Sequence, residues 1–394
     1  MGHTDVSGLA RKLTPGRLLL FVVNDAGFFL SHRLPIALKA RDEGYDVQVA
    51  TAPSAATADI VRLGFAFHAL PLSRSGRHVA SELAAFVALF RLFRRLRPDV
   101  VHLVTIKPVI YGGIAARLTR LPAVVSAVSG LGTVFLAQGA KARIVRLLVT
   151  QLYRLAFGHH NLKVIFQNED DRASFVDQAI VPESRTTIVP GSGVDLSEFA
   201  APPEPAGAVV VTMTSRLLHD KGVDEFVAAA IRVRSRRPEV VFQLAGSLDP
   251  GNPTSLTAEE YQRIQAEGAV RLLGHRPDIA RLLAESSIIV LPSYREGLPK
   301  SLVEAAAAGR AVVTTDVPGC RDAVLPGVTG LLVPHRDAAA LASAIEELAA
   351  DSERRAAMGA AGRRFAEDRF SIVSIVAQHL LIYAGLLAGS IKSS

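Results

Sequence analysis

The chain alternates apolar β-type runs with helical runs, and this alternation begins twice along the sequence. The first series contains the strand-like runs Arg17–Val23, Asp46–Thr51, Val100–Val104, Ala123–Val128 and Lys163–Phe166. Helical runs separate them, at Leu30–Glu43, at Ile110–Thr119 and in an amphipathic run from Ser81 to Arg97 that Pro98 ends. Neighbouring parallel strands need a crossover of this length, so the order predicts an α/β fold with a parallel sheet and helices on both faces.

A proline-containing stretch from Ser197 to Gly207 interrupts this pattern and reads as a linker. The alternation then restarts, with strand candidates at Ala208–Met213, Val240–Ala245, Val270–Leu273, Ile288–Leu291 and Ala311–Thr314. A length of 394 residues is sufficient for two separate cores. We therefore expect two Rossmann-like domains whose parallel sheets face each other across a cleft. Ligands should bind at the carboxyl ends of the strands.

Composition places the chain among globular proteins, with 49% hydrophobic and 21% charged residues. Cys320 is the only cysteine, which excludes an intramolecular disulfide and fits a reducing compartment. The stretch Met1–Arg17 lacks the apolar segment of a signal peptide, and the run Leu18–Val23 is too short to supply one. These features lead us to expect a cytoplasmic protein.

The stretch Pro292–Ala305 carries the strongest chemical signal. It follows the strand-like run Ile288–Leu291, and it contains Glu296, a Gly-Leu-Pro turn and then Glu304. The order strand, tight loop and helix start exposes backbone N–H groups that suit a phosphate. Carboxylates are hydrogen-bond acceptors only, and they suit the hydroxyl groups of a sugar. A site with both properties matches a nucleotide sugar.

Two cations follow the strand candidate Ala208–Met213. Arg216 and Lys221 lie five residues apart in a loop that should open at the carboxyl edge of the sheet. A forked guanidinium and a compact ammonium suit a diphosphate. By themselves they favour the interpretation as solvated loop cations; together with the Glu296–Glu304 segment they favour an anion site. The turn-rich loops Gly246–Pro253 and Leu273–Asp278 lie at the same edge of the sheet. Either could approach the nucleotide base, but ordinary turn chemistry explains their composition equally well.

Charge is distributed unevenly along the first half. The net charge is +7, yet no Asp or Glu occurs from Val100 to Asn168, where eight Lys and Arg do. The alternatives are a solvated basic face and a surface that contacts anionic lipid or a diphosphate-linked acceptor. Aliphatic rather than aromatic residues stand between the cations, and no nucleic-acid-binding module is visible, so nucleic acid is disfavoured.

Two helical segments bear on membrane contact. The segment Lys141–His160 would form a basic amphipathic helix, either an interfacial one or an ordinary surface helix packed on the sheet. The stretch Phe370–Ile391 has no charged residue and is long enough to span a bilayer. Its Ser371, Gln378 and His379 favour instead a buried helix that packs across the domains.

These residues, in this order, resemble the retaining glycosyltransferases of family 4, which have the GT-B fold. The likeness runs along nearly the whole chain. Its specific parts are Ser215-Arg216, Lys221-Gly222, Leu273–Arg276, Pro292-Ser293, Glu296–Pro299, Glu304-Ala305 and Gly309, together with Asn24–Arg33, Val101–Pro108, Tyr111–Gly113 and Gly191–Asp195 in the first part. Within the family the chain is most similar to bacterial members that add an N-acetylhexosamine to an undecaprenyl-diphosphate-linked sugar.

The resemblance assigns roles to matching positions. Arg216 and Lys221 would hold the donor diphosphate and stabilise it as the leaving group, and Glu296 would contact the donor sugar. Glu304 would bind the ribose. Further donor contacts would come from Gly27, Arg276 and the backbone of Gly297, Leu298 and Lys300. Acceptor contacts would come from His32, Arg33, His102, Lys107, Ser129 and Gly130. For His102, which lies inside a strand, a core histidine is the alternative.

One departure from the family pattern concerns the loop that follows Ala123–Val128. Many members carry a His there, whereas this chain reads Ser129-Gly130-Leu131-Gly132. Some members with lipid acceptors share this Gly-Leu-Gly form. The backbone groups of Ser129–Gly132 would then replace the His contact.

The resemblance implies transfer with retention at the anomeric carbon. Negative charge grows on the departing diphosphate, and Arg216 and Lys221 would stabilise it in the transition state. No metal ion is then required, and the chain has no Asp-x-Asp motif. The alternatives are a nucleotide-sugar 2-epimerase of the same fold and a non-catalytic scaffold that binds sugar nucleotides or lipid. A dinucleotide oxidoreductase is disfavoured, because no Gly-x-Gly-x-x-Gly follows a predicted strand.

The complete expectation is a glycosyltransferase with two domains and a returning helix. Residues 1–203 would form the domain that faces acceptor and membrane, residues 204–370 would bind the nucleotide sugar, and residues 371–394 would pack back on the first domain. The enzyme would transfer a hexose or N-acetylhexosamine from a UDP-sugar to a lipid-diphosphate-linked saccharide. It would act in polysaccharide assembly as a peripheral protein on the inner face of the cell membrane.

Overall fold

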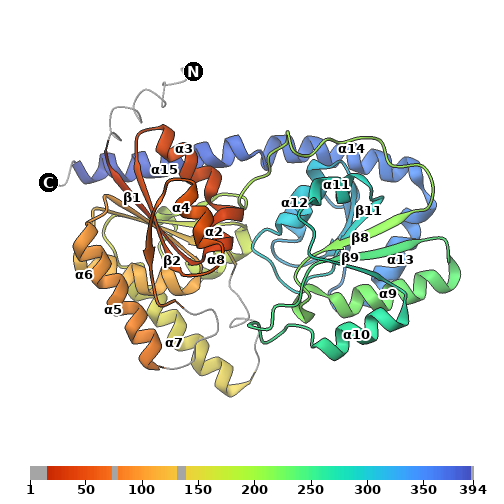
Figure 1. Ribbon diagram of the computed structural model, residues 1–394, viewed down its shortest axis with the longest axis horizontal. Coiled ribbons are helices and arrows are strands. Elements are labelled where there is room, and N and C mark those ends of the chain that lie inside the picture. Colours follow the sequence, from red (N-terminus) through yellow and green to blue (C-terminus); the bar gives the residue numbers. More distant parts are fainter. Residues whose placement is uncertain (1–15, 73–78, 131–138, 392–394) are drawn as a thin grey trace. The chain divides into compact units, whose positions relative to one another are not determined.

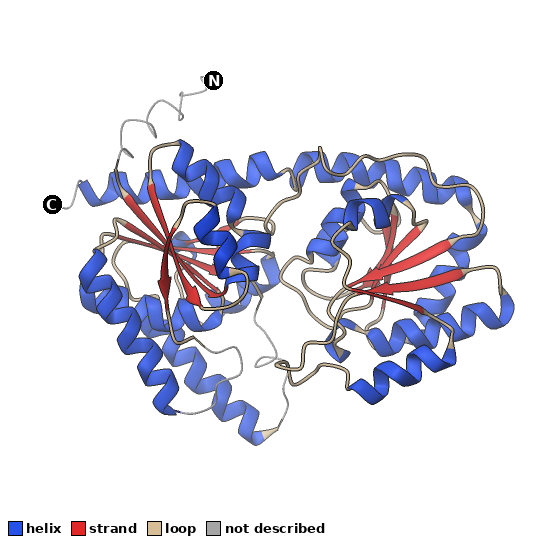
Figure 2. Ribbon diagram, in the orientation of Figure 1, coloured by secondary structure: helices blue, strands red, loops and turns tan. Residues whose placement is uncertain are grey.

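The computed structural model describes residues 16–72, 79–130 and 139–391. The chain forms two compact units (Figure 1). Unit 1 consists of Met1–Val189 and Ile375–Ser394, and unit 2 of Pro190–Ser374. Each unit has one sheet covered by helices (Figure 2), and every pairing between the named strands is parallel. The predicted α/β class with two parallel sheets is confirmed.

Unit 1 has a seven-stranded sheet in the order β3-β2-β1-β4-β5-β6-β7. Its strands are β1 (Leu18–Asp25), β2 (Asp46–Ala52), β3 (Ala66–Ala69), β4 (Val100–Val104), β5 (Ala123–Val128), β6 (Leu162–Phe166) and β7 (Thr186–Ile188). Its helices are α2 (Ala26–His32), α3 (Leu34–Asp42), α4 (Thr57–Arg62), α5 (Val79–Leu96), the π-helix η1 (Pro108–Gly112), α6 (Gly113–Thr119), α7 (Ala140–Ala156), α8 (Glu169–Asp177) and the 3₁₀ turn η3 (Glu183–Arg185).

Unit 2 has a six-stranded sheet in the order β10-β9-β8-β11-β12-β13. Its strands are β8 (Val210–Thr214), β9 (Val241–Ala245), β10 (Arg271–Gly274), β11 (Ile288–Leu291), β12 (Ala311–Thr315) and β13 (Gly330–Val333). Its helices are η4 (His219–Lys221), α9 (Val223–Arg236), α10 (Ala258–Glu267), α11 (Ile279–Ala284), α12 (Lys300–Ala307), η5 (Arg321–Ala323), α13 (Ala338–Ala350) and α14 (Ser352–Arg369), followed by α15 (Ile372–Ile391).

Each sheet has one topological switch point, where the chain stops adding strands on one side and starts adding them on the other. In unit 1 the chain builds outward from β1 on one side and from β4 on the other, and in unit 2 from β8 and β11. In parallel α/β sheets ligands bind at such a switch point, outside the carboxyl ends of the strands. The central strands β4 and β11 are buried at every residue, because helices cover both faces of each sheet.

Two helices expected as continuous are each divided in the structure. The run Leu30–Glu43 contains the end of α2 and all of α3, with Pro35 in the first turn of α3. Proline has no N–H to continue a helix but fits at a helix start, so the chain restarts there. The run Ile110–Thr119 begins in the π-helix η1 and continues as α6.

The C-terminal helix α15 packs on unit 1 through one stripe. Ile375, His379, Tyr383 and Leu387 recur every four residues and are buried. In the described part of the chain, α15 is the one helix whose length and hydropathy would allow it to cross a membrane, and a helix in a globular core passes the same test. Its buried stripe matches the helix expected to pack back on the first domain.

The division between the units falls at Val189, whereas the sequence placed it at residue 203. The difference arises because residues 194–204 are fixed to unit 2. Arg363 donates to the carbonyls of Phe199 and Leu196 at 2.5 and 3.3 Å, and Val194 pairs with Ser371. A stretch held by this many hydrogen bonds is part of the unit and not a free linker.

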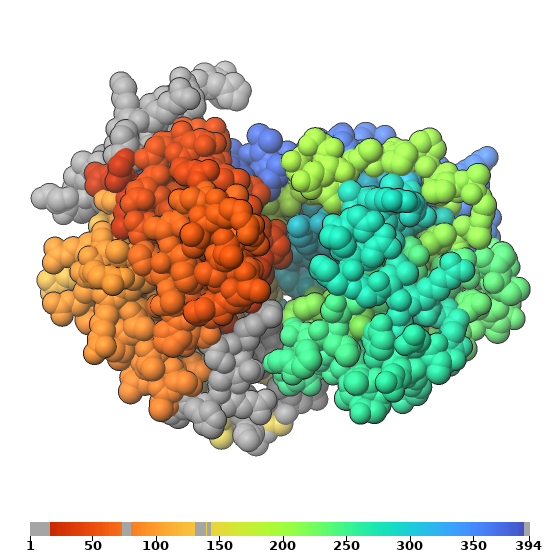
Figure 3. Space-filling view, viewed as in Figure 1, coloured from red at the N-terminus to blue at the C-terminus, as the bar shows by residue number. Residues whose placement is uncertain are grey.

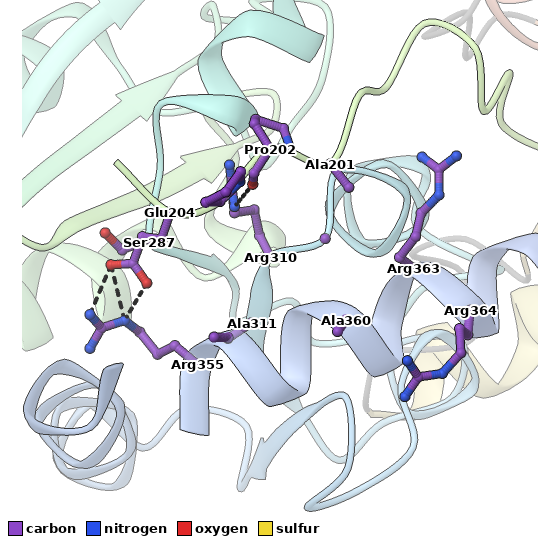
Figure 4. Close-up of a pocket in the computed structure, with 13 residues that line it drawn as sticks. Ala201, Pro202, Glu204, Ser287, Arg310, Ala311, Arg355, Ala360, Arg363 and Arg364 are labelled. Atoms are coloured by element: carbon purple, nitrogen blue, oxygen red, sulfur yellow. Dashed lines mark hydrogen bonds and ion pairs between the residues drawn. The ribbon is translucent and has the colours of Figure 1, made fainter. Parts of the chain in front are cut away.

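A cavity of about 430 Å³ lies beside this stretch, at the amino ends of β11 and β12 (Figure 4). Arg355 binds Glu204 through two nitrogens, at 2.9 and 2.8 Å. Arg310 is buried and donates to the carbonyls of Leu283, Pro202 and Ala284 at 3.0, 3.0 and 2.7 Å. These guanidinium groups hold parts of unit 2 to one another, so the cavity is structural.

We predict that Arg310→Ala destabilises the protein by about 2–4 kcal/mol, because three buried carbonyls lose their donor. Thermal unfolding followed by circular dichroism measures the effect. Arg364→Ala, which lines the same cavity, is the control and should shift the unfolding temperature little. Equal shifts for the two variants would contradict the structural role of Arg310.

Candidate functional site

Two loops meet at the switch point of unit 2. One joins β8 to α9 and contains Lys221; the other joins β11 to α12 and contains Glu296. The carbonyl of Asp220 accepts hydrogen bonds from Tyr294 N at 2.9 Å and from Ser293 Oγ at 3.0 Å. These bonds fix the backbones of the two loops together.

Gly222 permits this approach. Its φ is +75°, and a Cβ at this position would lie 2.1 Å from the carbonyl oxygen of Pro292. Only glycine combines that backbone conformation with the close contact. The Lys221-Gly222 pair in the sequence therefore has two roles, a cation and the glycine that lets its loop close.

Lys221 and Glu296 form an ion pair at the centre of the site. Lys221 Nζ donates to Glu296 Oε1, and Ser293 Oγ donates to the same oxygen at 2.7 Å. The two charged side chains are only 20% and 12% exposed. An ammonium has three N–H donors, so Lys221 is oriented by Glu296 while retaining donors for an anionic ligand.

The backbone of Glu296 is supported from behind by the turn after β12. Glu296 N donates to the carbonyl of Pro318 at 3.1 Å. Gly319 has φ +80°, and a Cβ there would lie 2.5 Å from the carbonyl oxygen of Glu296. The turn at Pro318-Gly319 therefore supports the backbone of Glu296.

Arg216 projects from the same loop as Lys221 but has a different partner. Its Nη1 donates to Asp249 Oδ2 at 2.6 Å, and its side chain is 47% exposed. Asp249 lies after β9, in the turn-rich loop Gly246–Pro253. The sequence did not predict this pair, because turn residues mark loops without indicating which loops touch. The half-exposed guanidinium has further N–H donors for a diphosphate.

Glu304 lies in the second turn of α12, on the strand-to-helix segment that the sequence singled out. Lys300 Nζ, one turn earlier, is 3.4 Å from Glu304 Oε1. Burial raises the pKa of the Glu304 carboxyl, and the nearby Lys300 lowers it to a smaller extent. A largely buried acceptor of this kind suits a ligand hydroxyl, which would add a second donor beside Lys300.

Arg276 forms an internal pair in the loop after β10. Its Nε and Nη2 donate to the two carboxylate oxygens of Asp278 at 2.7 and 2.6 Å. This contact lowers the pKa of Asp278 to about 2. The planar fork that would bind a donor phosphate is therefore engaged by Asp278.

Unit 1 places two predicted acceptor residues in its interior. His102 is fully buried, and its Nδ1 shares a hydrogen bond of 2.6 Å with the hydroxyl of Tyr383 on α15. Arg33 is 2% exposed, and its Nη1 donates to the carbonyl of His32 at 3.0 Å. Burial lowers the pKa of His102 well below its ordinary value and that of Arg33 to about 10. The acceptor role expected for both is thus wrong, and for His102 the core alternative holds.

The remaining candidates of unit 1 lie nearer its carboxyl edge. Lys107 Nζ donates to Glu82 Oε1 at 2.6 Å, and Tyr111 donates to the other oxygen of the same carboxylate at 2.6 Å. The ring of His32 stacks on Phe28 at 4.1 Å.

Gly27 and the pair Ser129-Gly130 were also predicted to contact substrate. Gly27 lies in the first turn of α2, after β1. Ser129 and Gly130 follow β5, and Gly130 has φ +113°. Their roles stay predictions. Leu131 and Gly132, which complete the expected backbone site, lie outside the described residues.

Comparisons with known proteins identify the family. The family model "Glycosyl transferase 4-like" matches residues 18–168, and "Glycosyl transferases group 1" matches residues 208–351. A Campylobacter jejuni N,N'-diacetylbacillosaminyl-diphospho-undecaprenol α-1,3-N-acetylgalactosaminyltransferase is 30% identical over 351 residues, which cover 84% of this chain and 90% of the relative. The chain belongs to glycosyltransferase family 4. An Escherichia coli UDP-Gal:α-D-GlcNAc-diphosphoundecaprenol α-1,3-galactosyltransferase is 26% identical and covers 65% of this transferase and 67% of its own length.

Solved structures show the same fold. The Anabaena protein Alr3699/HepE, in complex with UDP and glucose, superposes with a TM-score of 0.71 at 21% identity and covers 91% of this chain and 97% of its own. WaaG, a glycosyltransferase of lipopolysaccharide biosynthesis, has a TM-score of 0.71 at 16% identity, with coverages of 93% and 100%. These matches confirm the GT-B fold of the transferase. The two relatives from C. jejuni and E. coli are transferases by name, and neither supports the epimerase alternative.

The described residues of the transferase contain no group of three or more His, Cys, Asp or Glu side chains placed to hold a metal ion. Lys221, Arg216 and Lys300 place positive charge around the switch point of unit 2. These side chains are what the site offers to an anionic ligand.

We predict opposite effects of Glu304→Gln on stability and on ligand binding. Since the pKa of Glu304 is raised in the folded state, ionising it costs stability, and this cost grows as pH rises from the ordinary glutamate pKa towards the raised one. The variant should unfold at a higher temperature than the wild type at pH 7. If Glu304 binds the ribose, as the resemblance implies, the stabilisation by UDP should fall, because the ribose would lose a carboxylate acceptor.

Scanning calorimetry at several pH values, with and without UDP, measures both effects. Glu198→Gln removes a carboxylate that is exposed and raises the pKa of Glu304 only slightly, so it is the matched control. A Glu304→Gln variant that responds to UDP as strongly as the wild type would remove Glu304 from the site.

Proposed function

We propose that this transferase moves a hexose or N-acetylhexosamine from a UDP-sugar to a lipid-diphosphate-linked saccharide. The observation that carries the proposal is the Lys221–Glu296 pair at the switch point of unit 2, with Ser293 on the same carboxylate oxygen. It combines an oriented cation for the leaving diphosphate with a carboxylate for the donor sugar. The UDP in the HepE complex and the undecaprenyl-diphosphate-linked substrates in the names of two relatives support the choice of donor and acceptor.

The proposed chemistry follows from where charge develops. As the bond between anomeric carbon and phosphate oxygen breaks, negative charge grows on the diphosphate while the sugar gains oxocarbenium character. Lys221 and Arg216 are placed to stabilise the first, and the Glu296 carboxylate to stabilise the second. Attack of the acceptor hydroxyl on the face that the diphosphate leaves would retain configuration, and the departing phosphate oxygen would take the proton. This route requires no metal ion.

The acceptor's lipid requires a membrane, and α7 of unit 1 suits the contact. Ile144, Leu147, Leu148 and Leu155 are 62%, 61%, 59% and 51% exposed, although they lie on a helix whose opposite side buries Tyr153 and Ala156. Side chains three and four residues apart share one helix face. The exposed face is thus aliphatic, and the helix has no acidic residue.

Basic residues accompany this aliphatic face. Arg143 lies in the first turn of α7, and Arg154 in its last turn donates to the carbonyl of Gln178 at 2.6 Å. The neighbouring α6 adds Arg117 and Arg120, which are exposed. An aliphatic face among cations without acids matches an anionic lipid surface, with leucines in the acyl region and arginines at phosphates.

The test of transfer is incubation with a panel of UDP-sugars and a short-chain lipid-diphosphate N-acetylhexosamine, with products identified by mass spectrometry and anomeric configuration by NMR. Formation of the lengthened lipid-linked saccharide supports the proposal. Binding of nucleotide sugars without any turnover would favour a non-catalytic scaffold instead.

We predict that Lys221→Ala lowers kcat by about 100–1,000-fold with a smaller change in donor KM, because the cation acts mainly on charge that forms in the transition state. Steady-state kinetics measure the effect. Arg281→Ala on α11, an exposed arginine paired with Glu285, is the control and should retain wild-type kcat. A variant that loses only donor affinity would place Lys221 in ground-state binding.

We predict that replacing Leu147 and Leu148 by Ser reduces binding to vesicles that contain phosphatidylglycerol, and that salt weakens wild-type binding by screening the arginines. Vesicle co-sedimentation measures both. Val328→Ser changes an equally exposed aliphatic residue of unit 2 and should bind like the wild type. If the double variant sediments as fully as the control, α7 is not the lipid-binding surface.

A further inference from the structure

The switch point of unit 1 carries polar side chains that have no partner. β1, β4 and β5 are adjacent strands, and the pairs Val23–Val104 and Val104–Ala127 align their carboxyl ends. Asn24 is the second-last residue of β1, and Thr105 and Ser129 directly follow β4 and β5. Among the described residues, Asn24 Oδ1, Thr105 Oγ1 and Ser129 Oγ are buried without a hydrogen bond. Buried polar atoms in folded proteins are nearly always paired, so three orphans at one edge require an explanation.

Thr105 is also strained. Its φ is +74°, a left-handed conformation that is a genuine outlier for a β-branched residue. Its carbonyl accepts from Val109 N at 3.0 Å, so Thr105 begins the helical turn that leads into η1. A threonine at such a position normally has an extended backbone and caps the helix with its hydroxyl; this one does neither. Strain of this kind persists where the surrounding structure holds a residue for a function.

The π-helix η1 holds Thr105 in place. Gly112 lets this helix approach β4, since a Cβ there would lie 2.5 Å from Leu103 Cδ2. Single π-turns are common at functional sites. Lys107, two residues beyond Thr105, is neutralised by Glu82. Asp25, at the end of β1, is the N-cap of α2 and accepts from Phe28 N at 2.9 Å. Asn24, Thr105 and Ser129 present uncharged amide and hydroxyl groups beside it.

We propose that Asn24, Thr105 and Ser129 form a sugar-recognition site in unit 1. Their side chains would form hydrogen bonds with ring hydroxyls or with the acetamido group of the acceptor saccharide. Neutral donors and acceptors suit these groups, whereas a diphosphate would require cations. That the sugar belongs to the acceptor rests on the proposed function. The assignment replaces Arg33 and His102, which are buried against α15, by residues at the carboxyl edge. Asn24 and Thr105 become specificity-determining residues.

The test uses Thr105→Gly, which removes both hydroxyl and strain, and Thr105→Ser, which retains the hydroxyl. Thr51→Val on β2 removes another buried hydroxyl without a partner, two strands away, and is the control. For Thr105→Gly we expect an acceptor KM raised about tenfold or more, an unchanged donor dissociation constant, and an unfolding temperature that is equal or higher. Thr105→Ser and Thr51→Val should retain the acceptor KM.

A lower unfolding temperature for Thr105→Gly together with an unchanged acceptor KM would overturn the proposal, because Thr105 would then be structural. A second measurement is independent of transfer: saturation-transfer NMR of the full chain with methyl glycosides of N-acetylhexosamines. Binding to the wild type that Thr105→Gly abolishes supports the site even if no acceptor is extended, an outcome that would refute only the proposed function. Equal glycoside signals in both proteins would overturn the site while leaving transfer intact.

Discussion

The donor half of this transferase depends on the approach of two backbones at the carboxyl ends of β8 and β11. Gly222 allows its loop to reach the carbonyl of Pro292, and the carbonyl of Asp220 then binds both Tyr294 and Ser293. Only in this arrangement does the ammonium of Lys221 meet the carboxylate of Glu296. A side chain at residue 222 would separate the loops and leave two buried charges without their partners, which is costly in a site of low polarity.

The two switch points of the chain differ in chemistry. That of unit 2 is ionic, with Lys221, Arg216 and Glu296 in defined pairs. That of unit 1 has the uncharged Asn24, Thr105 and Ser129, each with a buried polar atom that lacks a hydrogen bond. A diphosphate leaving group needs oriented cations, whereas a saccharide needs uncharged groups that discriminate hydroxyl positions. Deeper in unit 1, burial keeps His102 and His379 neutral, with the pKa of His379 lowered to about 3. These histidines bind α15 to the sheet and do not take part in the chemistry.

Much of the fold could be predicted because helix and strand periods differ. β4, β5 and β11 agree with the predicted strands residue for residue, since mainly apolar runs of four to six residues between helices have few other interpretations. The short edge strands β3 and β7 were not predicted, because three or four half-buried residues carry little signal. The division of Leu30–Glu43 into α2 and α3 and the attachment of residues 194–204 to unit 2 depended on Pro35 and on distant arginines.

By itself, the sequence determined the fold class, the order of the strands along the chain, and the residues of the donor segment. Spacing and residue type are local properties, and they suffice to mark Glu296, Glu304, Arg216 and Lys221 as candidates for one nucleotide-sugar site. Only the tertiary structure decided the pairing of these groups. It joined Lys221 to Glu296, gave Arg216 to Asp249, placed Arg33 and His102 in the core, and left Asn24 and Thr105 without partners at the sheet edge. The reason is physical: burial and hydrogen bonding join residues that the sequence separates by tens or hundreds of positions, and no local pattern records those contacts. Within unit 2, the space-filling view (Figure 3) shows segments of different colour, which are far apart in the sequence, side by side at the surface.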